Sequence, residues 1–141
     1  MYPRSASVQV VTARIAEVRA FYQEHFDAII TFDCGWYVVL RLGAGEGAPE
    51  LCFMEPRAGS SEYAGGVTLN LRFDDVDAVH ERLSAAGVEV SEPLADHPWG
   101  DRGFGILDPS GLAAYCYHDI PMTDEFKPFL ALDPGQREGE L

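Results

Sequence analysis

The stretch TLNLRFDDVDAVHERLSAAG, residues 68–87, has the pattern of a short strand followed by an amphipathic helix. Residues 68–73 are strand-like, and a helix is predicted from Asp74 to Gly87. Asp74 or Asp75 suits the N-cap, and Gly87 suits the first position after the C-terminus. The predicted apolar stripe of this helix consists of Val76, Val79, Leu83 and Ala86.

The same pattern occurs 61 residues earlier, in SVQVVTARIAEVRAFYQEHF, residues 7–26. Hardly any residue is identical between the two stretches, but the strand phase and the helix phase both match. Such agreement indicates an internal structural repeat. The matched apolar positions are Val8 with Leu69, Val10 with Leu71, Ile15 with Val76, Val18 with Val79, and Tyr22 with Leu83.

Three strand-like stretches follow each helix, so the chain is predicted to be an α+β protein made of two βαβββ modules. The first set is 28–32, 36–42 and 51–54; the second is 88–90, 103–107 and 112–117. Asp108-Pro109-Ser110-Gly111 has the residues of a type I turn and is expected to close a hairpin. We expect one domain over 1–141, composed of module 7–54, linker 55–66, module 67–118 and a tail 119–141.

Composition excludes several classes of function. The chain has 47% apolar and 23% charged residues, as a globular domain does, and a net charge of −13. An acidic protein repels phosphate backbones and anionic lipids, so no nucleic-acid or membrane partner is expected. Three cysteines without a CxxC spacing argue against a disulfide framework. No secretory leader and no apolar run long enough to span a bilayer is visible, so we expect a cytoplasmic protein.

Paired βαβββ modules resemble the vicinal-oxygen-chelate superfamily, which comprises glyoxalases, bleomycin-resistance proteins and dioxygenases. The local sequences that carry the resemblance are TARIAEVRAFYQEHF (12–26), FDDVDAVHERLSAAGVEV (73–90) and HPWGDRGFGILDPSGLAAYCY (97–117). The resemblance implies that two curved mixed sheets enclose a cavity. It also implies four metal-ligand positions, one on the first and one on the last strand of each module: Ser7, Cys52, Thr68 and Tyr115.

Those four residues do not form a ligand set for a divalent catalytic metal, which requires imidazole and carboxylate donors. We therefore expect no metal and no cofactor. This disfavours metal-dependent glyoxalase or extradiol dioxygenase activity. What remains resembles the bleomycin-resistance type, whose members are acidic homodimers that confer antibiotic resistance by sequestering a cationic or flat aromatic drug.

Several side chains are candidate contacts for a small organic ligand. Trp36 and Trp99 offer flat faces for a planar or cationic ring, or else serve core or dimer packing. Polar residues at matching strand positions suggest a wet or ligand-filled cavity, the alternative being ordered water. Tyr115 is either a hydrogen-bond donor or a buried tyrosine bonded to backbone. The predicted ligand-binding residues are Ser7, Gln9, Trp36, Cys52, Thr68, Asn70, Trp99, Tyr115 and Tyr117.

Three functions are open on this sequence. We expect a non-catalytic small-molecule-binding protein that acts as a homodimer. The alternative is a metal-free lyase, isomerase or oxygenase in the same cavity, with Tyr115 or His97 as the acid–base group. Here His97, with Asp96 and Asp101, is expected in a loop before Trp99, where simple solvation is the other interpretation. The third possibility is an interaction module with a collapsed cavity.

Overall fold

The computed structural model describes residues 1–131. Its chain forms two compact units, each with its own sheet and helix. The first comprises Met1–Leu69 and Ile106–Ala114, and the second comprises Asn70–Gly105 and the chain from Tyr115.

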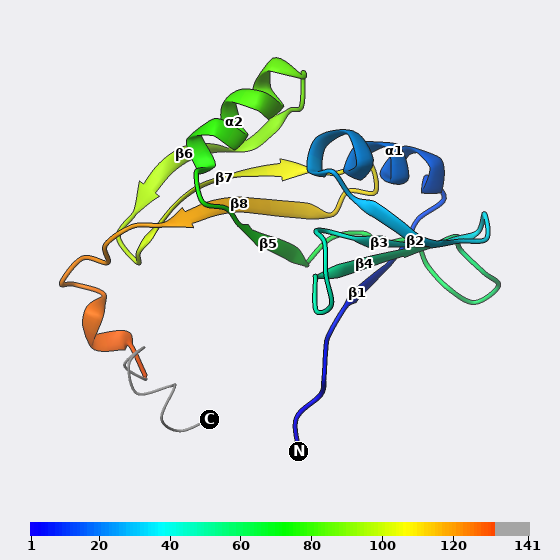
Figure 1. Cartoon of the computed structure of the whole chain (residues 1–141), viewed down its shortest axis with the longest axis horizontal. Helices are drawn as coiled ribbons and strands as arrows, with labels where there is room; N and C mark the ends of the chain where they lie inside the picture. Colours follow the sequence, from blue (N-terminus) through cyan, green and yellow to red (C-terminus); the bar gives the residue numbers. More distant parts are fainter. Residues whose placement is uncertain (132–141) are drawn as a thin grey trace. The chain divides into compact units, whose positions relative to one another are not determined.

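The two sheets have the same strand order relative to their modules. The first has the order β1-β4-β3-β2 and the second β5-β8-β7-β6 (Figure 1). This arrangement confirms the predicted α+β fold of two βαβββ modules. No helix among residues 1–131 is long and apolar enough to cross a membrane. The elements are β1 (Val8–Val11), α1 (Ile15–Phe26), β2 (Ile29–Asp33), β3 (Tyr37–Arg41), β4 (Glu50–Met54), β5 (Thr68–Arg72), α2 (Val76–Ala85), β6 (Val90–His97), β7 (Asp101–Leu107), β8 (Ala113–Asp119) and the short 3-10 helix η1 (Lys127–Phe129).

In the first unit, α1 covers one face of its sheet. β1 pairs parallel to β4, which pairs antiparallel to β3. The helix buries Ile15, Val18 and Tyr22, and the ring of Tyr22 lies 5.7 Å from that of Phe53 on β4. The Tyr22 hydroxyl donates a 2.5 Å hydrogen bond to the buried carboxylate of Asp108. A buried polar pair of this kind fixes the helix against the turn that follows β7.

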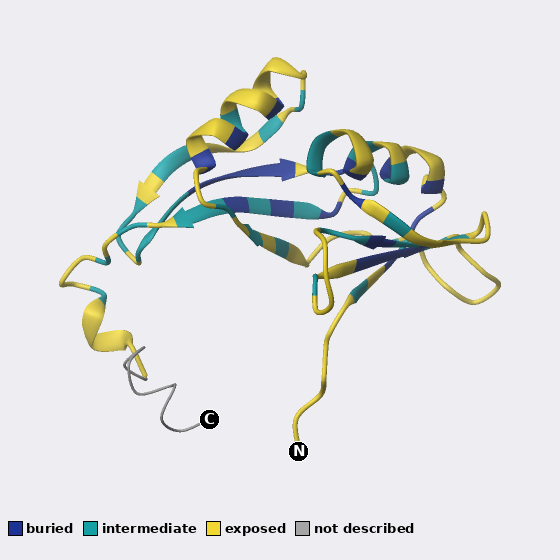
Figure 2. Cartoon of the chain, viewed as in Figure 1, coloured by how far each residue is buried: buried dark blue, intermediate teal, exposed yellow. Residues whose placement is uncertain are grey.

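In the second unit, α2 buries Val76, Val79 and Leu83. These positions lie 61 residues after the three buried residues of α1, so the repeat inferred from sequence is confirmed. Asp75 accepts a hydrogen bond from the Ala78 amide at 3.2 Å and caps the helix, so it is the N-cap among the two predicted candidates, Asp74 and Asp75. Figure 2 shows the buried positions of both helices on the side that faces their own sheet.

The structure corrects the sequence analysis at three places. The predicted strand 88–90 is in fact β6, Val90–His97, so His97 ends a strand and does not lie in a loop. Pro93 lacks an amide donor and therefore argues against a central strand. β6 is at an edge of its sheet, where a missing donor is tolerated. Ser7 precedes β1, and Trp36 precedes β3, so neither belongs to the strand that was predicted to contain it.

The predicted tail is also partly ordered. β8 extends to Asp119, and the chain then continues as an irregular segment to η1. The part of the tail beyond residue 131 lies outside the described residues.

Candidate functional site

The candidate site lies on the face of the second sheet opposite α2. Along β8, Ala114 and Cys116 are buried, whereas Tyr115 and Tyr117 alternate with them and are partly exposed. The two tyrosine rings stack, with centroids 5.8 Å apart and an interplanar angle of 18°. Strand alternation therefore gives the site an aromatic floor.

The Tyr115 hydroxyl is part of a three-residue hydrogen-bond cluster. It donates to Asp101 Oδ1 at 2.5 Å, and it lies 3.0 Å from His97 Nδ1. That nitrogen lies 2.9 Å from Asp101 Oδ1. Burial raises the pKa of Tyr115 well above 10, and the hydrogen bond to Asp101 raises it further. The phenol is therefore neutral at physiological pH and serves as a donor.

Trp99 extends this cluster to the turn between β6 and β7. Its indole Nε1 donates to Asp101 Oδ2 at 2.7 Å, so both oxygens of this carboxylate accept hydrogen bonds. The indole also stacks on His97, with centroids 4.6 Å apart and planes 8° apart. Asp101 thus fixes Tyr115 and Trp99 together. The sequence analysis placed Asp101 beside His97 but did not count it as a site residue.

Gly103 allows Tyr115 to take this position. A Cβ at residue 103 would lie 2.6 Å from Tyr115 Oη and 2.6 Å from the carbonyl oxygen of Cys116. No side chain fits there without moving the phenol. The sequence analysis missed this role, although Gly103 and Gly105 in the middle of a strand are a signal of close approach by another group.

These side chains line a pocket of about 240 Å³, named here the Trp99 pocket. Four of the nine predicted ligand-binding residues line this pocket, and their contact with a ligand stays a prediction. Its lining is Asn70, Trp99, Gly100, Asp101, Tyr115, Tyr117 and Asp119.

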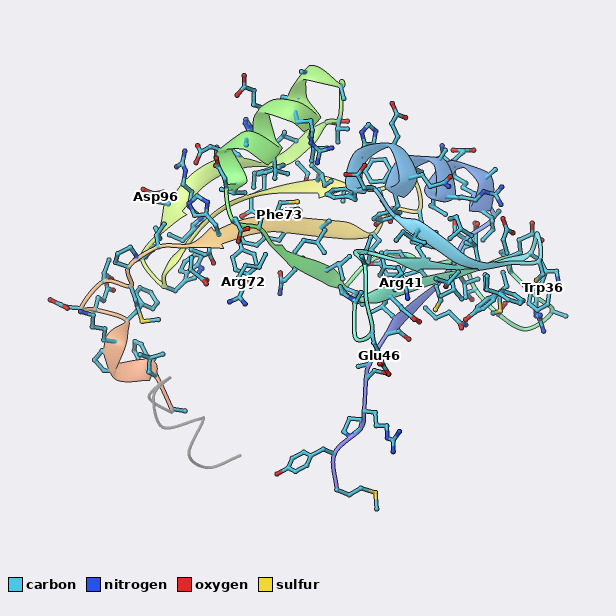
Figure 3. The ribbon with its side chains drawn as sticks, viewed as in Figure 1. Trp36, Arg41, Glu46, Arg72, Phe73 and Asp96 are labelled. Carbon is cyan, nitrogen blue, oxygen red and sulfur yellow. The ribbon has the colours of Figure 1, made fainter. Side chains whose placement is uncertain are left out.

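A larger pocket of about 510 Å³ lies beside the end of β5. Figure 3 labels two of its lining residues, Arg72 and Phe73, and Asp74, His118 and Asp119 complete it. Its one cation from β5, Arg72, already pairs with Asp119 at 3.2 Å, and both side chains are exposed. The smaller pocket is the better candidate because the rings of Trp99, Tyr115 and Tyr117 line it, whereas Phe73 is the one phenyl ring among the described residues that line the larger pocket.

The other predicted residues lie in the first unit and do not form one cluster. Gln9 and Cys52 are opposite each other on the paired strands β1 and β4, and the thiol is buried. Contact with that thiol raises the pKa of Tyr37. Ser7 lines a pocket of about 360 Å³ with residues 4–6 and 47–50, and Thr68 is exposed at the start of β5.

Trp36 is 45% exposed at the turn before β3 (Figure 3). The guanidinium of Arg57 lies 3.9 Å from the centroid of its ring. One face of this indole is therefore already covered by a cation of the same chain. A cavity shared by the two modules, and the ligand contacts of these residues, stay predictions.

The residues at the four metal positions implied by the resemblance do not suit a catalytic metal. Two hydroxyls, a thiol and a phenol occupy them, and the phenol of Tyr115 has a raised pKa and donates to Asp101. These four positions therefore do not provide the ligands of a catalytic metal.

A second group of potential metal ligands is present near the start of α2: Asp75, Asp77 and His118. Each already has a structural partner. Asp75 caps the helix, Asp77 binds Arg102 through two bonds of 2.7 and 3.0 Å, and His118 Nδ1 accepts from the Val76 amide at 2.9 Å. A metal here would compete with Arg102 for the carboxylate of Asp77.

Comparison with known proteins identifies the family. Residues 4–114 match the model of the glyoxalase/bleomycin resistance protein/dioxygenase superfamily. An uncharacterized protein of Mycobacterium bovis is 36% identical over 63 residues, which are 45% of this chain and 41% of that protein. This match therefore spans less than half the length of that relative.

Two solved structures show the same fold at low identity. A superfamily member from Sphaerobacter thermophilus superposes with a TM-score of 0.71 at 18% identity, over 84% of this chain and 99% of that one. A lactoylglutathione lyase from Agrobacterium tumefaciens superposes with a TM-score of 0.67 at 20% identity, over 84% of this chain and 96% of that one. On the extent of the family match, the chain belongs to the glyoxalase/bleomycin resistance protein/dioxygenase superfamily.

Proposed function

We propose that this protein binds a small cationic aromatic compound in the Trp99 pocket and releases it unmodified, as a sequestering protein of the bleomycin-resistance type does. The observation that carries the proposal is the composition of the pocket. Trp99, Tyr115 and Tyr117 supply three aromatic rings, and Asp101 supplies the carboxylate on which the proposal rests, since the exposed Asp119 already pairs with Arg72. Aromatic faces beside carboxylates attract organic cations through cation–π and charge interactions.

The size of the pocket limits the part of the ligand that it holds. Small-molecule sites usually measure about 300–1,000 Å³. The Trp99 pocket, at about 240 Å³, is somewhat smaller. It suits a single ring with its attached cationic group, and the rest of a larger compound would extend beyond it.

The net charge of −13 favours the same class of ligand. It raises the local concentration of cations and speeds their encounter, and salt weakens this effect. A phosphorylated metabolite or a coenzyme-A ester would meet repulsion at long range and carboxylates at the site.

Catalysis by Tyr115 is the second candidate, since its hydroxyl contacts both His97 and Asp101. An acid–base group works best when its pKa is near the operating pH. Burial raises the pKa of Tyr115 further from physiological pH, so the phenol suits hydrogen bonding to a ligand better than proton transfer. His97 is then the acid–base group that the enzyme alternative depends on.

Calorimetric titration tests the proposal with three probes: phenyltrimethylammonium, benzenesulfonate as the anionic ring, and tetramethylammonium as the cation without a ring. We expect the first to bind more tightly than the other two. Asp101→Asn should weaken its binding about tenfold, because the amide removes the charge and its NH2 group replaces one of the two oxygens that accept from Tyr115 and Trp99. Asp96→Asn is the matched control, since Asp96 is exposed, pairs with Arg102 and carries the same charge (Figure 3).

Trp99→Ala should cost about 1–3 kcal/mol of binding free energy if the indole stacks on the ligand. Preferred binding of benzenesulfonate, or equal losses in the two Asp variants, would contradict the proposed ligand class. Loss of binding in Trp36→Ala alone would move the site to the first unit. Recovery of a chemically altered compound from a wider panel would favour the metal-free enzyme. If no compound of that panel binds, the result would favour an interaction module.

A homodimer and a cytoplasmic location are part of the same proposal. β2 is an edge strand of the first sheet, and it exposes Ile29 and Phe32 by 40% and 52%. An edge strand with exposed apolar side chains is a template for pairing with another chain, and a second copy of this protein is the partner we propose.

A further inference from the structure

The segment after β8 binds the turn that carries Trp99. The amide of Ile120 donates to the carbonyl of Gly100 at 3.0 Å. The amide and the hydroxyl of Thr123 both donate to the carbonyl of Pro98, at 3.0 and 3.2 Å. The carbonyls on both sides of Trp99 are therefore bonded to a segment that lies outside residues 4–114, the part of the chain that matches the family model.

The turn is built for this contact at Gly100. Its φ of +108° is one that residues with a side chain rarely adopt. A Cβ there would also lie 3.3 Å from the carbonyl oxygen of Ile120 and 3.4 Å from Met122 Cβ. The missing side chain lets the two backbones approach.

The indole of Trp99 is held from three directions. His97 stacks on it, Asp101 accepts its N–H, and the ring of Phe126 meets it edge-on at 6.0 Å and 72°. His97 and Asp101 belong to the neighbouring strands, whereas Phe126 comes from the C-terminal segment. Despite these contacts Trp99 is 48% exposed, so one part of the ring remains available to the pocket.

We propose that residues 120–126, named here the C-terminal clamp, are a positioning element of the Trp99 pocket. The clamp fixes the turn through Ile120 and Thr123 and fixes the indole through Phe126. It thereby sets the orientation of the wall against which a ligand ring packs. The structural part of this inference stands by itself, and its consequence for ligand choice rests on the proposed function.

Amide hydrogen exchange on the full chain tests the structural part directly. The amides of Ile120 and Thr123 should be protected, because each donates to a carbonyl of the turn. Exchange of both at the rate of an unstructured peptide would overturn the clamp.

Acrylamide quenching tests the effect on Trp99, with Trp36→Phe as the background so that only one indole emits. Adding Phe126→Ala and Thr123→Ala should expose the indole. The indole is now 48% exposed and keeps its contacts with His97 and Asp101 in the double variant, so the quenching constant should rise by less than about twofold. Phe32→Ala is the control, because it removes a 52% exposed ring from the first unit. No rise, or an equal rise in the control, would overturn the clamp.

Titration with phenyltrimethylammonium separates this inference from the proposed function. The double variant should bind the probe more weakly than the background protein, with the control unchanged. Increased quenching without probe binding in any variant supports the clamp and rejects the proposed ligand. Unchanged probe affinity alongside increased quenching would overturn the role of the clamp in ligand choice.

Discussion

Gly103→Ala gives the sharpest test of the site geometry. The added Cβ would lie 2.6 Å from Tyr115 Oη, whereas ordinary contact begins at 3.4 Å. The carbonyl oxygen of Cys116 is equally close, at 2.6 Å, so β7 and β8 must separate and the phenol must also move by about 0.8 Å. A displacement of that size directed away from the cluster would stretch the 2.5 Å bond to Asp101 and would break the 3.0 Å contact with His97.

Overpacking of a core costs about 1–3 kcal/mol, and a hydrogen bond to a charged group is worth about 1.5–3 kcal/mol. Because the bond is weakened and not removed, we expect Gly103→Ala to lower the free energy of unfolding by about 2–4 kcal/mol. With a urea m-value of about 2 kcal/mol/M, the midpoint should fall by roughly 1–2 M.

Gly105→Ala is the matched control, since it changes the same strand at the next position on the same face. Its Cβ would meet Glu92 Cβ at 3.0 Å and Ser91 Oγ at 3.2 Å, which are contacts that a shift of β6 by a few tenths of an ångström relieves. We expect a loss of less than about 1 kcal/mol. The smaller backbone freedom of alanine in the unfolded state is common to both variants and cancels. Urea midpoints within about 0.3 M of each other would refute the reasoning.

Three further predictions concern other parts of the chain. Tyr22→Phe removes the buried 2.5 Å hydrogen bond to Asp108 and should lower the free energy of unfolding, measured with urea, by about 1.5–3 kcal/mol. Asp108→Ala should lower it further, since this carboxylate also accepts hydrogen bonds from Ser110 and Leu112. Equal free energies of unfolding for the two variants would contradict this role of the turn. The hydrogen bonds and charge of Arg102 hold the pKa of Asp77 below 3.8, so its NMR titration midpoint should rise in Arg102→Ala. Because the pKa of Asp77 is lower in the folded than in the unfolded protein, the pair stabilises the fold at pH values above the unfolded pKa. This contribution is lost as the pH falls through the folded pKa. An unchanged titration midpoint in Arg102→Ala would show that the pair does not form in solution. Light scattering should give twice the mass of the 15.5 kDa chain, and a monomer at micromolar concentration would exclude the homodimer.

The fold of this protein follows from local patterns that are visible in the sequence. A helix repeats every 3.6 residues and buries one face, so the buried residues of both helices were predictable from their spacing. These residues are Ile15, Val18 and Tyr22 in α1, and Val76, Val79 and Leu83 in α2. Their shared offset of 61 residues then indicated two modules. The N-cap at Asp75 was also predictable, because capping depends on neighbours within three residues.

The extent of β6 was not predictable from local pattern. Pro93 removes an amide donor, which argues against a central strand. Only the order of the assembled sheet shows that β6 is an edge, where that donor is not required. The sequence predicts a loop at His97, whereas His97 ends β6 and lies 3.0 Å from the Tyr115 hydroxyl.

The candidate site was decided by tertiary structure. Alternation along β8 predicts that Tyr115 and Tyr117 share a face, but it cannot predict which groups lie opposite them. Asp101 meets Tyr115 because two strands pair and because Gly103 leaves room for the phenol. Hydrogen bonds between separate strands depend on register and on distances of a few tenths of an ångström, and neither is encoded in the period of a single strand.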